Sequence, residues 1–207
     1  MLVSAREGYR RWAASYDGAP NPIVSLIDRS IDMKNTRGHR VIDVACGTGR
    51  WVKRLGAIGV DLSFEMLARS RSGRVIQANA RWLPFADDVA DLVLCILALG
   101  YCSPVHEVMR ELARIARPGA SIVACDVHPA ALAAGWTRSF RDGDEVYEIE
   151  NQSYALDHLA VEGLTLEAAR DLYFGEPERA IYANAGKSAL FEEIRETPAV
   201  WMRRWRK

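Results

Sequence analysis

The chain has 207 residues, and its 27 Lys and Arg residues balance its 27 Asp and Glu residues, so its formal net charge is zero. This length suits a single domain, and a balanced charge gives no overall field that would attract nucleic acid or an anionic membrane. The longest nearly uncharged run, residues 92–102, is far shorter than the ~20 residues needed to span a bilayer, so we expect a soluble protein with no membrane partner.

The first 35 residues predict two helices that cap a pocket. Tyr9, Trp12 and Tyr16 recur at helical spacing within residues 5–16. A Pro-Asn-Pro sequence then interrupts the pattern before a second amphipathic stretch, Ile23 to Met33. Aromatic residues at this spacing usually pack in a core, so for Tyr16 and Trp12 a packing role is as well supported as contact with a ligand.

Five short apolar runs predict the strands of a parallel sheet. They are Arg40 to Val44, Ala57 to Val60, Arg74 to Gln77, Ala90 to Leu94 and Ala120 to Asp126. Such runs are typical of strands that helices bury on both faces. Between the fourth and fifth runs, apolar residues recur at three- and four-residue steps over 105–115, which predicts the helix of a βαβ crossover.

The last third of the chain predicts a loop and a terminal strand pair. Residues 130–154 are polar and irregular but carry four aromatic residues, and we expect them to form a substrate lid. The segment 155–207 then completes the single domain 1–207. Its expected elements are a helix over Tyr154 to Glu162, a strand over Leu164 to Phe174, a helix over Lys187 to Arg195 and a strand over Pro198 to Arg206.

A glycine-rich turn indicates a nucleotide pocket within residues 36–129. The first apolar run leads into Gly47 and Gly49, and the second ends at Asp61, eighteen residues beyond Asp43. Glycines at the carboxyl end of a strand let the backbone approach a ligand, and the later acid is placed to bind ribose hydroxyls. Val52 stands where a dinucleotide turn would have its third glycine, so an NAD-dependent oxidoreductase is the weaker alternative.

Several motifs in order give the chain a more specific resemblance. They are Tyr9-x-x-Trp12-Ala13-x-x-Tyr16-Asp17, the Asp43 to Gly49 turn, Val60-Asp61-Leu62-Ser63 with Met66-Leu67, Asn79-Ala80 before Leu83-Pro84-Phe85, Asp91-Leu92-Val93, and Arg117-Pro118-Gly119. On these residues the chain resembles the class I S-adenosylmethionine-dependent methyltransferases, of the small-molecule, type 11 kind. The resemblance covers about residues 9–129. It implies an α/β, Rossmann-like fold with a seven-stranded, mostly parallel sheet, an antiparallel terminal strand pair and helices on both faces.

The resemblance also implies a set of residues that bind S-adenosylmethionine. They are Tyr16, Asp43, Ala45, Cys46, Gly47, Gly49, Asp61, Leu62, Met66, Asn79 and Ala80. Asp43 would lie near the cofactor's amino group, Asp61 would accept its ribose hydroxyls, and Tyr16 would lie near its sulfonium. Leu62 and Met66 would pack on the adenine, whose edge Asn79 and the Ala80 backbone would bind. The family usually has Gly where Ala45 and Ala78 stand and Asp where Asn79 stands.

Methyl transfer from a sulfonium mainly requires that nucleophile, methyl carbon and sulfur be held in line, so an obvious catalytic base is not required. His128, after the fifth predicted strand, is the best candidate for a base, and Tyr101, after the fourth, is the second. A role for His128 in capping or packing under the next loop is equally well supported. His106 near a helix start is expected to be exposed, and we expect no metal site.

These features favour a methyltransferase that modifies an oxygen, nitrogen or carbon of a small organic molecule. A protein that binds the cofactor without transferring the methyl group is the alternative. The aromatic and basic residues of 201–207 are also compatible with stacking on RNA, although a final strand with solvated arginines is the simpler interpretation. The four cysteines form no Cys-x-x-Cys pair and mostly lie in apolar runs, as expected of reduced thiols in a cytoplasmic protein.

Overall fold

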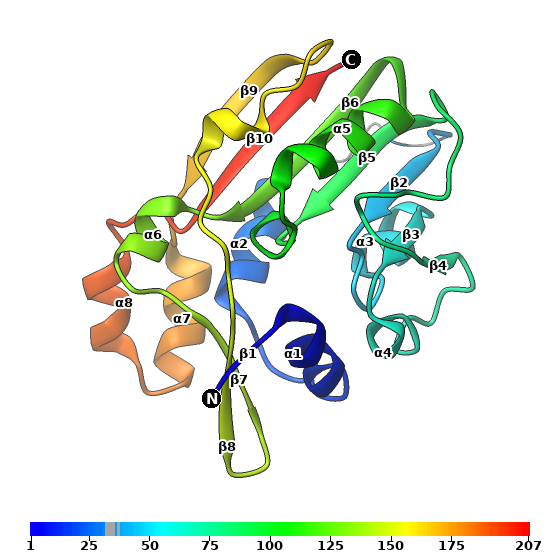
Figure 1. The fold of residues 1–207 in the computed structure, drawn as a ribbon. Helices are drawn as coiled ribbons and strands as arrows, with labels where there is room; N and C mark the ends of the chain where they lie inside the picture. The colour runs from blue at the N-terminus through cyan, green and yellow to red at the C-terminus, as the bar shows by residue number, and fades with distance from the viewer. Residues whose placement is uncertain (32–35, 37) are drawn as a thin grey trace.

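The structure is a computed structural model that describes residues 1–31, 36 and 38–207. Its central sheet has seven strands in the order β4-β3-β2-β5-β6-β10-β9. The strands are β2 (Val41–Val44), β3 (Ile58–Asp61), β4 (Val75–Gln77), β5 (Ala90–Ile96), β6 (Ala116–Val127), β9 (Thr165–Leu172) and β10 (Val200–Arg206). The first five run parallel to one another, and β10 pairs antiparallel with both β6 and β9. This confirms the predicted seven-stranded α/β sheet with an antiparallel terminal pair (Figure 1).

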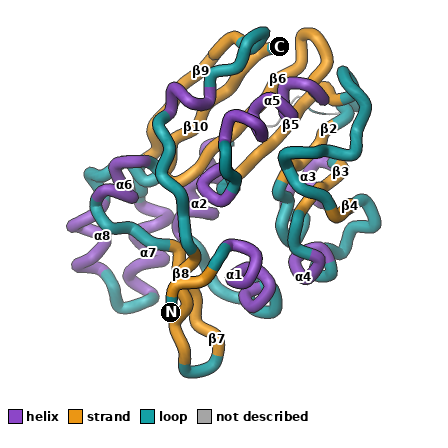
Figure 2. The backbone as a smooth tube through the Cα atoms, in the orientation of Figure 1, coloured by secondary structure: helices purple, strands orange, loops and turns teal. Residues whose placement is uncertain are grey.

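Helices cover both faces of this sheet (Figure 2). The α-helices are α1 (Ala5–Trp12), α2 (Pro22–Ser30), α3 (Arg50–Leu55), α4 (Phe64–Leu67), α5 (Val105–Ile115), α6 (Pro129–Ala133), α7 (Glu176–Asn184) and α8 (Ser188–Ile194). Two short 3-10 helices are η1 (Leu99–Tyr101) and η2 (Leu156–Leu159).

Alternation of side chains along the strands divides the core into two clusters. Ile42 and Val93 point to the cluster that contains α5, whereas Val41 and Leu94 point to the cluster that contains residues of α2, α3 and α8. Strands with apolar side chains on both faces are what a parallel sheet buried between helix layers requires. The uninterrupted apolar runs in the sequence have this physical origin.

The segment expected to be an irregular lid contains regular structure, which corrects the sequence-based interpretation. Within it, α6 is followed by a hairpin of β7 (Arg138–Asp142) and β8 (Glu145–Ile149). The hairpin joins β1 (Leu2–Val3) in a second, three-stranded sheet of order β1-β8-β7. Figure 1 shows this hairpin extending away from the central sheet, beside α1. The sequence pattern missed it because only Phe140, Tyr147 and Ile149 are buried among alternating exposed polar residues.

Three further elements differ from expectation. The helix predicted over Tyr154 to Glu162 is only the short 3-10 helix η2, and the first helix ends at Trp12 instead of continuing to Tyr16. Helix α7 was not predicted at all. The last residues of the second predicted helix, Asp32 and Met33, lie outside the described residues.

The C-terminal strand uses its aromatic residues for packing. Trp201 is 0% exposed and Trp205 is buried in the same cluster as α5. Neither indole ring is therefore free to stack on RNA bases, and the arginines between them follow the solvent-facing side of β10 or pair with acids of β9, as Arg203 does with Asp171.

Candidate functional site

A cavity of about 270 Å³ lies at the carboxyl ends of β2, β3 and β5. The turn after β2, the end of β3 and residues 78–81 form one half of its wall, and α1, α2 and η1 form the other. Adjacent parallel strands place these ends together, because Asp43 is in register with Gly59 and Val44 with Val60. The sheet edge is where open α/β folds bind ligands.

The turn after β2 has an unusual backbone. Ala45, Gly47 and Gly49 all have positive φ, at 58°, 56° and 83°. Gly49 precedes α3, and a Cβ atom there would lie 2.5 Å from the Ser70 hydroxyl oxygen. Ala45 holds a left-handed conformation that costs an L-residue about 1–2 kcal/mol. Strain of this kind is typical of ligand-binding turns.

Asp61 connects this turn to the end of β3. Its Oδ2 accepts a hydrogen bond from the backbone N–H of Gly47 at 2.8 Å, and its Oδ1 accepts one from Ser63 at 2.8 Å. Burial raises the pKa of Asp61, while these N–H donors act in the opposite direction. A carboxylate has about four lone-pair sites, so acceptor capacity for two ribose hydroxyls remains.

Asp43 is a buried carboxylate of the site with one unpartnered oxygen. Its side chain is 1% exposed, and Oδ2 has no hydrogen-bond partner in the part of the chain that the structure describes. Burial, followed by the charge of Asp61, raises its pKa well above the usual range. A buried carboxylate without a partner is costly, and a cationic ligand group would offset that cost.

The residues expected to bind adenine line the same cavity. Met66 is buried, whereas Leu62 is 51% exposed and presents an apolar surface beside the cavity. Asn79 and Ala80 also line it. The Asn79 Oδ1 accepts a bond from the Arg81 backbone at 3.0 Å, which leaves its NH₂ group as the free donor.

Aromatic side chains form the opposite wall. Tyr9, Tyr16 and Tyr101 all line the cavity, and the Tyr9 and Tyr101 rings meet edge to face with centroids 5.5 Å apart. Tyr16 also packs on Trp12, at 4.8 Å between centroids, so the structure shows a packing role for a residue that lines the cavity. Burial raises the pKa of Tyr101, and Arg138 acts against that rise.

His128 is not where a base would be useful. Its Nδ1 accepts a hydrogen bond from the Ala130 N–H at 3.0 Å and thereby caps α6, and its Nε2 lies 3.7 Å from Asp171. It is not among the cavity-lining residues. The capping role that the sequence also allowed is the one the structure shows, because Pro129 starts a helix directly after this residue.

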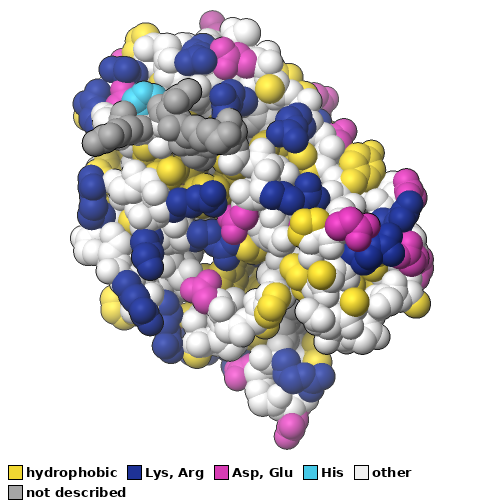
Figure 3. Space-filling model, turned by 180° about the vertical axis from the view of Figure 1, so that it is seen from behind, with side chains coloured by type: hydrophobic (Ala, Val, Ile, Leu, Met, Phe, Trp, Pro, Cys, Tyr) yellow, Lys and Arg dark blue, Asp and Glu magenta, His cyan; other side chains and the backbone are white. Residues whose placement is uncertain are grey.

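Sequence reasoning missed the ion pairs in the cavity wall. Arg50 donates to Asp28 at 3.1 Å, and Arg81 pairs with Glu107 at 2.5 Å. Asp28, Arg50 and Arg81 line the cavity, whereas Glu107 does not. From behind, the molecule shows a hollow with basic and acidic side chains near it (Figure 3). The only available signal was the position of Arg50 directly after the glycine turn, since the contact with Asp28 depends on how α2 packs.

The chain resembles known methyltransferases in sequence and in structure. A family model described as a methyltransferase domain matches residues 42–124. The chain is 31% identical to phosphatidylethanolamine N-methyltransferase of Cereibacter sphaeroides over 59% of this chain and 67% of that protein, and 36% identical to demethylmenaquinone methyltransferase of Mycolicibacterium paratuberculosis over 55% and 58%. The crystal structure of an S-adenosylmethionine-dependent methyltransferase from Mesorhizobium loti superposes with a TM-score of 0.63 at 20% identity, covering 98% of this chain and 100% of that one.

The chain belongs to the class I S-adenosylmethionine-dependent methyltransferases. It spans about half to two thirds of the length of the curated relatives that it matches. The cofactor of this family is S-adenosylmethionine.

The residues of the cavity fit this cofactor. The unpartnered Oδ2 of Asp43 suits a cationic amino group, and a Cβ at Gly47 would come within 3.2 Å of the Met66 terminal methyl, so the backbone there is kept open. Asp61 and Leu62 offer the acceptor and the apolar surface that a ribose and an adenine need. Among the described residues, we find no group of three or more His, Cys, Asp or Glu side chains that would hold a metal, and no helix long and apolar enough to cross a membrane.

Proposed function

We propose that this protein transfers the methyl group of S-adenosylmethionine to an oxygen, nitrogen or carbon atom of a small organic molecule. The observation that carries the proposal is the continuity of one cavity from the carboxylates of Asp43 and Asp61 to the aromatic wall of Tyr9, Tyr16 and Tyr101. The cofactor would occupy the first half, with the residues predicted from the sequence, and the acceptor the second. We also propose that the protein acts in the cytoplasm, where its four free cysteines would stay reduced.

Within this proposal, catalysis rests on positioning. The rigid turn and the aromatic wall would hold the acceptor in line with the sulfonium and exclude water, which can supply about 7–11 kcal/mol of the barrier. Of the two residues predicted as catalytic, only Tyr101 lines the cavity; His128 lies outside it. Its raised pKa favours the neutral hydroxyl, which suits donation of a hydrogen bond better than proton abstraction at neutral pH.

The test is turnover. Purified protein is incubated with isotopically labelled S-adenosylmethionine and a fractionated metabolite extract, and mass spectrometry follows both S-adenosylhomocysteine and any labelled product. We expect a labelled product that is lost in Asp61→Ala and kept in Asp144→Ala, an exposed acid at the hairpin tip. Cofactor binding without product from any fraction would contradict transfer and favour the second candidate, a cofactor-binding protein without turnover, which the position of His128 supports.

A further inference from the structure

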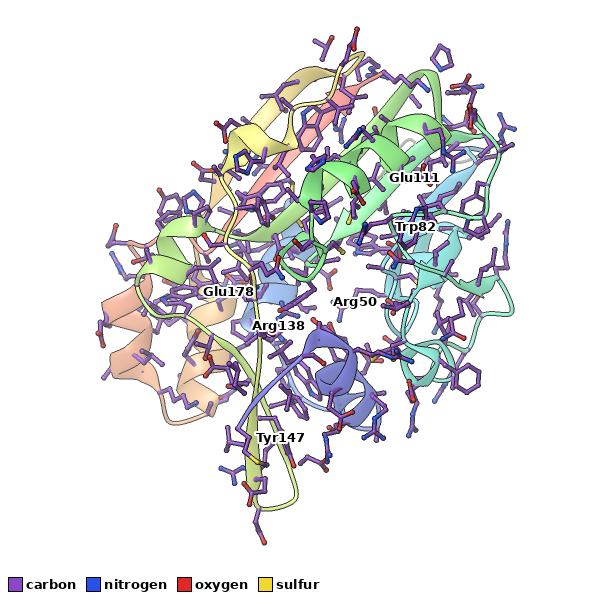
Figure 4. The ribbon with its side chains drawn as sticks, in the orientation of Figure 1. Arg50, Trp82, Glu111, Arg138, Tyr147 and Glu178 are labelled. Carbon is purple, nitrogen blue, oxygen red and sulfur yellow. The ribbon has the colours of Figure 1, made fainter. Side chains whose placement is uncertain are left out.

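Arg138 is a cation without an acidic partner directly behind the aromatic wall. It begins β7, and among the described residues its only side-chain hydrogen bond goes to the Tyr9 hydroxyl, at 3.2 Å. None of the ion pairs formed by those residues includes Arg138, and the acid whose charge acts on it is Asp126. Its guanidinium also lies 5.9 Å from the Tyr101 ring centroid. Figure 4 shows Arg138 where the hairpin meets the body of the molecule.

The buried acid that acts on this cation, Asp126, makes its own hydrogen bonds to backbone groups instead of to Arg138. Asp126 is 2% exposed, and both of its carboxylate oxygens accept backbone hydrogen bonds, from Gly100 and from Val127, each at 2.8 Å. Burial raises the pKa of Asp126 and so disfavours its ionised form, although Arg138 acts against this. An arginine side chain stays protonated in such surroundings. Arg138 therefore keeps its charge behind the wall without a direct ion pair among the described residues.

The hydroxyl groups in front of Arg138 are incompletely hydrogen-bonded. Tyr9 accepts the bond from Arg138, and its hydroxyl lies against that of Tyr101, which is buried and makes no hydrogen bond of good geometry among the described residues. Next to Tyr101, the side chain of Asn151 packs against Gly100, and its Oδ1 is also unpartnered. Buried polar atoms without partners gather where a ligand or ordered water completes the network.

This arrangement selects among acceptor chemistries. Two incompletely hydrogen-bonded hydroxyl groups in front of a cation match an oxyanion, since charge-assisted hydrogen bonds to a carboxylate are about twice as strong as neutral ones. A protonated amine would meet the field of Arg138 with the same sign of charge. The flat rings of Tyr9 and Tyr101 suit a planar or apolar remainder of the molecule.

We propose that the acceptor half of the cavity recognises a small organic carboxylate, bound by the hydroxyl groups of Tyr9 and Tyr101 with the guanidinium of Arg138 behind them. The proposal rests on the proposed function, because it names the acceptor class of that same cavity. Arg138 is here a positioning residue that acts through the two tyrosines.

The test uses matched pairs of probes that differ in charge but hardly in shape: benzoate with benzamide, and phenylacetate with phenylacetamide. Binding to the full chain is measured by NMR titration with and without saturating S-adenosylhomocysteine. We expect at least one carboxylate to bind about tenfold or more tightly than its amide. Arg138→Gln should abolish that preference, Arg138→Lys should retain part of it, and Tyr101→Phe should reduce it without disturbing the fold.

Arg141→Gln is the matched control, because Arg141 lies on the same strand but is exposed, and among the described residues its side chain bonds only the Asp144 carbonyl. It should leave the preference unchanged. Equal binding of carboxylate and amide in both pairs, or a preference that survives Arg138→Gln, would overturn the proposal. If the proposed function is wrong, the protein should not bind S-adenosylhomocysteine. The titrations done without S-adenosylhomocysteine still show whether the cavity prefers a carboxylate to its amide.

Discussion

Replacement of Asp43 by Asn should stabilise the protein without ligand while weakening cofactor binding. The carboxylate is 1% exposed and its Oδ2 has no hydrogen-bond partner in the described chain, so its ionised form carries an uncompensated desolvation cost. An unsatisfied buried group of this kind costs about 1–3 kcal/mol, and more when charged. For a chain of this length, that corresponds to an increase in melting temperature of roughly 2–12 °C.

The effect should depend on pH in a defined direction. The pKa of Asp43 is raised in the folded protein, so the unfolded chain loses its proton first as pH rises. Stability therefore falls with pH from about pH 4, the unfolded pKa, up to the raised folded pKa. Asn cannot ionise, so the difference in unfolding free energy between the Asn variant and the wild type should grow from about pH 4 upward.

Urea unfolding of both proteins at several pH values between 4 and 9 measures this difference. Titration with S-adenosylmethionine then measures the accompanying loss of affinity, because the cofactor's amino group loses its anionic partner. The reasoning would be refuted by an Asn variant that is less stable at pH 8, or by a stability difference that is constant across the range.

Two further substitutions test the local structure by urea unfolding. Gly49→Ala should destabilise the protein by about 1–2 kcal/mol or more, because φ is 83° and the new Cβ would crowd Ser70; unchanged stability would contradict the described turn. Glu178→Gln should cost about 1–3 kcal/mol at pH 7, because Glu178 is 0% exposed and pairs with Arg29 of α2. Burial opposes ionisation of Glu178, but Arg29 and two other donors outweigh it and lower its pKa, so this cost should disappear as pH falls below about 4; a cost independent of pH would contradict the ion pair.

The half of the cavity that we propose holds the cofactor could be predicted because its residues are positioned by local sequence. Asp43 lies one residue before the end of β2 and Asp61 ends β3, and adjacent parallel strands bring those ends together whatever the rest of the chain does. A glycine at position 49 likewise indicates a backbone with positive φ, which few other residues adopt. All of these signals lie within a few residues of the atoms that they position.

The half that we propose holds the acceptor could not be predicted because it depends on contacts between residues far apart in the sequence. Arg138 lies in a polar stretch, and it reaches Tyr9 only because the hairpin pairs with the two-residue strand β1 at the start of the chain. His128 lies at the correct sheet edge, but its side chain caps α6. This helix is only five residues long, and its apolar sequence does not predict it. Helix α7 did have a signal, since Pro177 and Glu178 follow Gly175 at capping-box spacing.

The most direct test of the central claim, that Asp61 and the turn after β2 hold S-adenosylmethionine, is calorimetric titration with S-adenosylhomocysteine. We predict binding with a dissociation constant in the micromolar range, corresponding to about −8 kcal/mol. Asp61→Ala should weaken it by about tenfold or more, since hydrogen bonds to a charged group contribute about 1.5–3 kcal/mol, while Asp144→Ala should bind as the wild type does. No measurable binding to the wild type, or equal binding to Asp61→Ala, would contradict the claim.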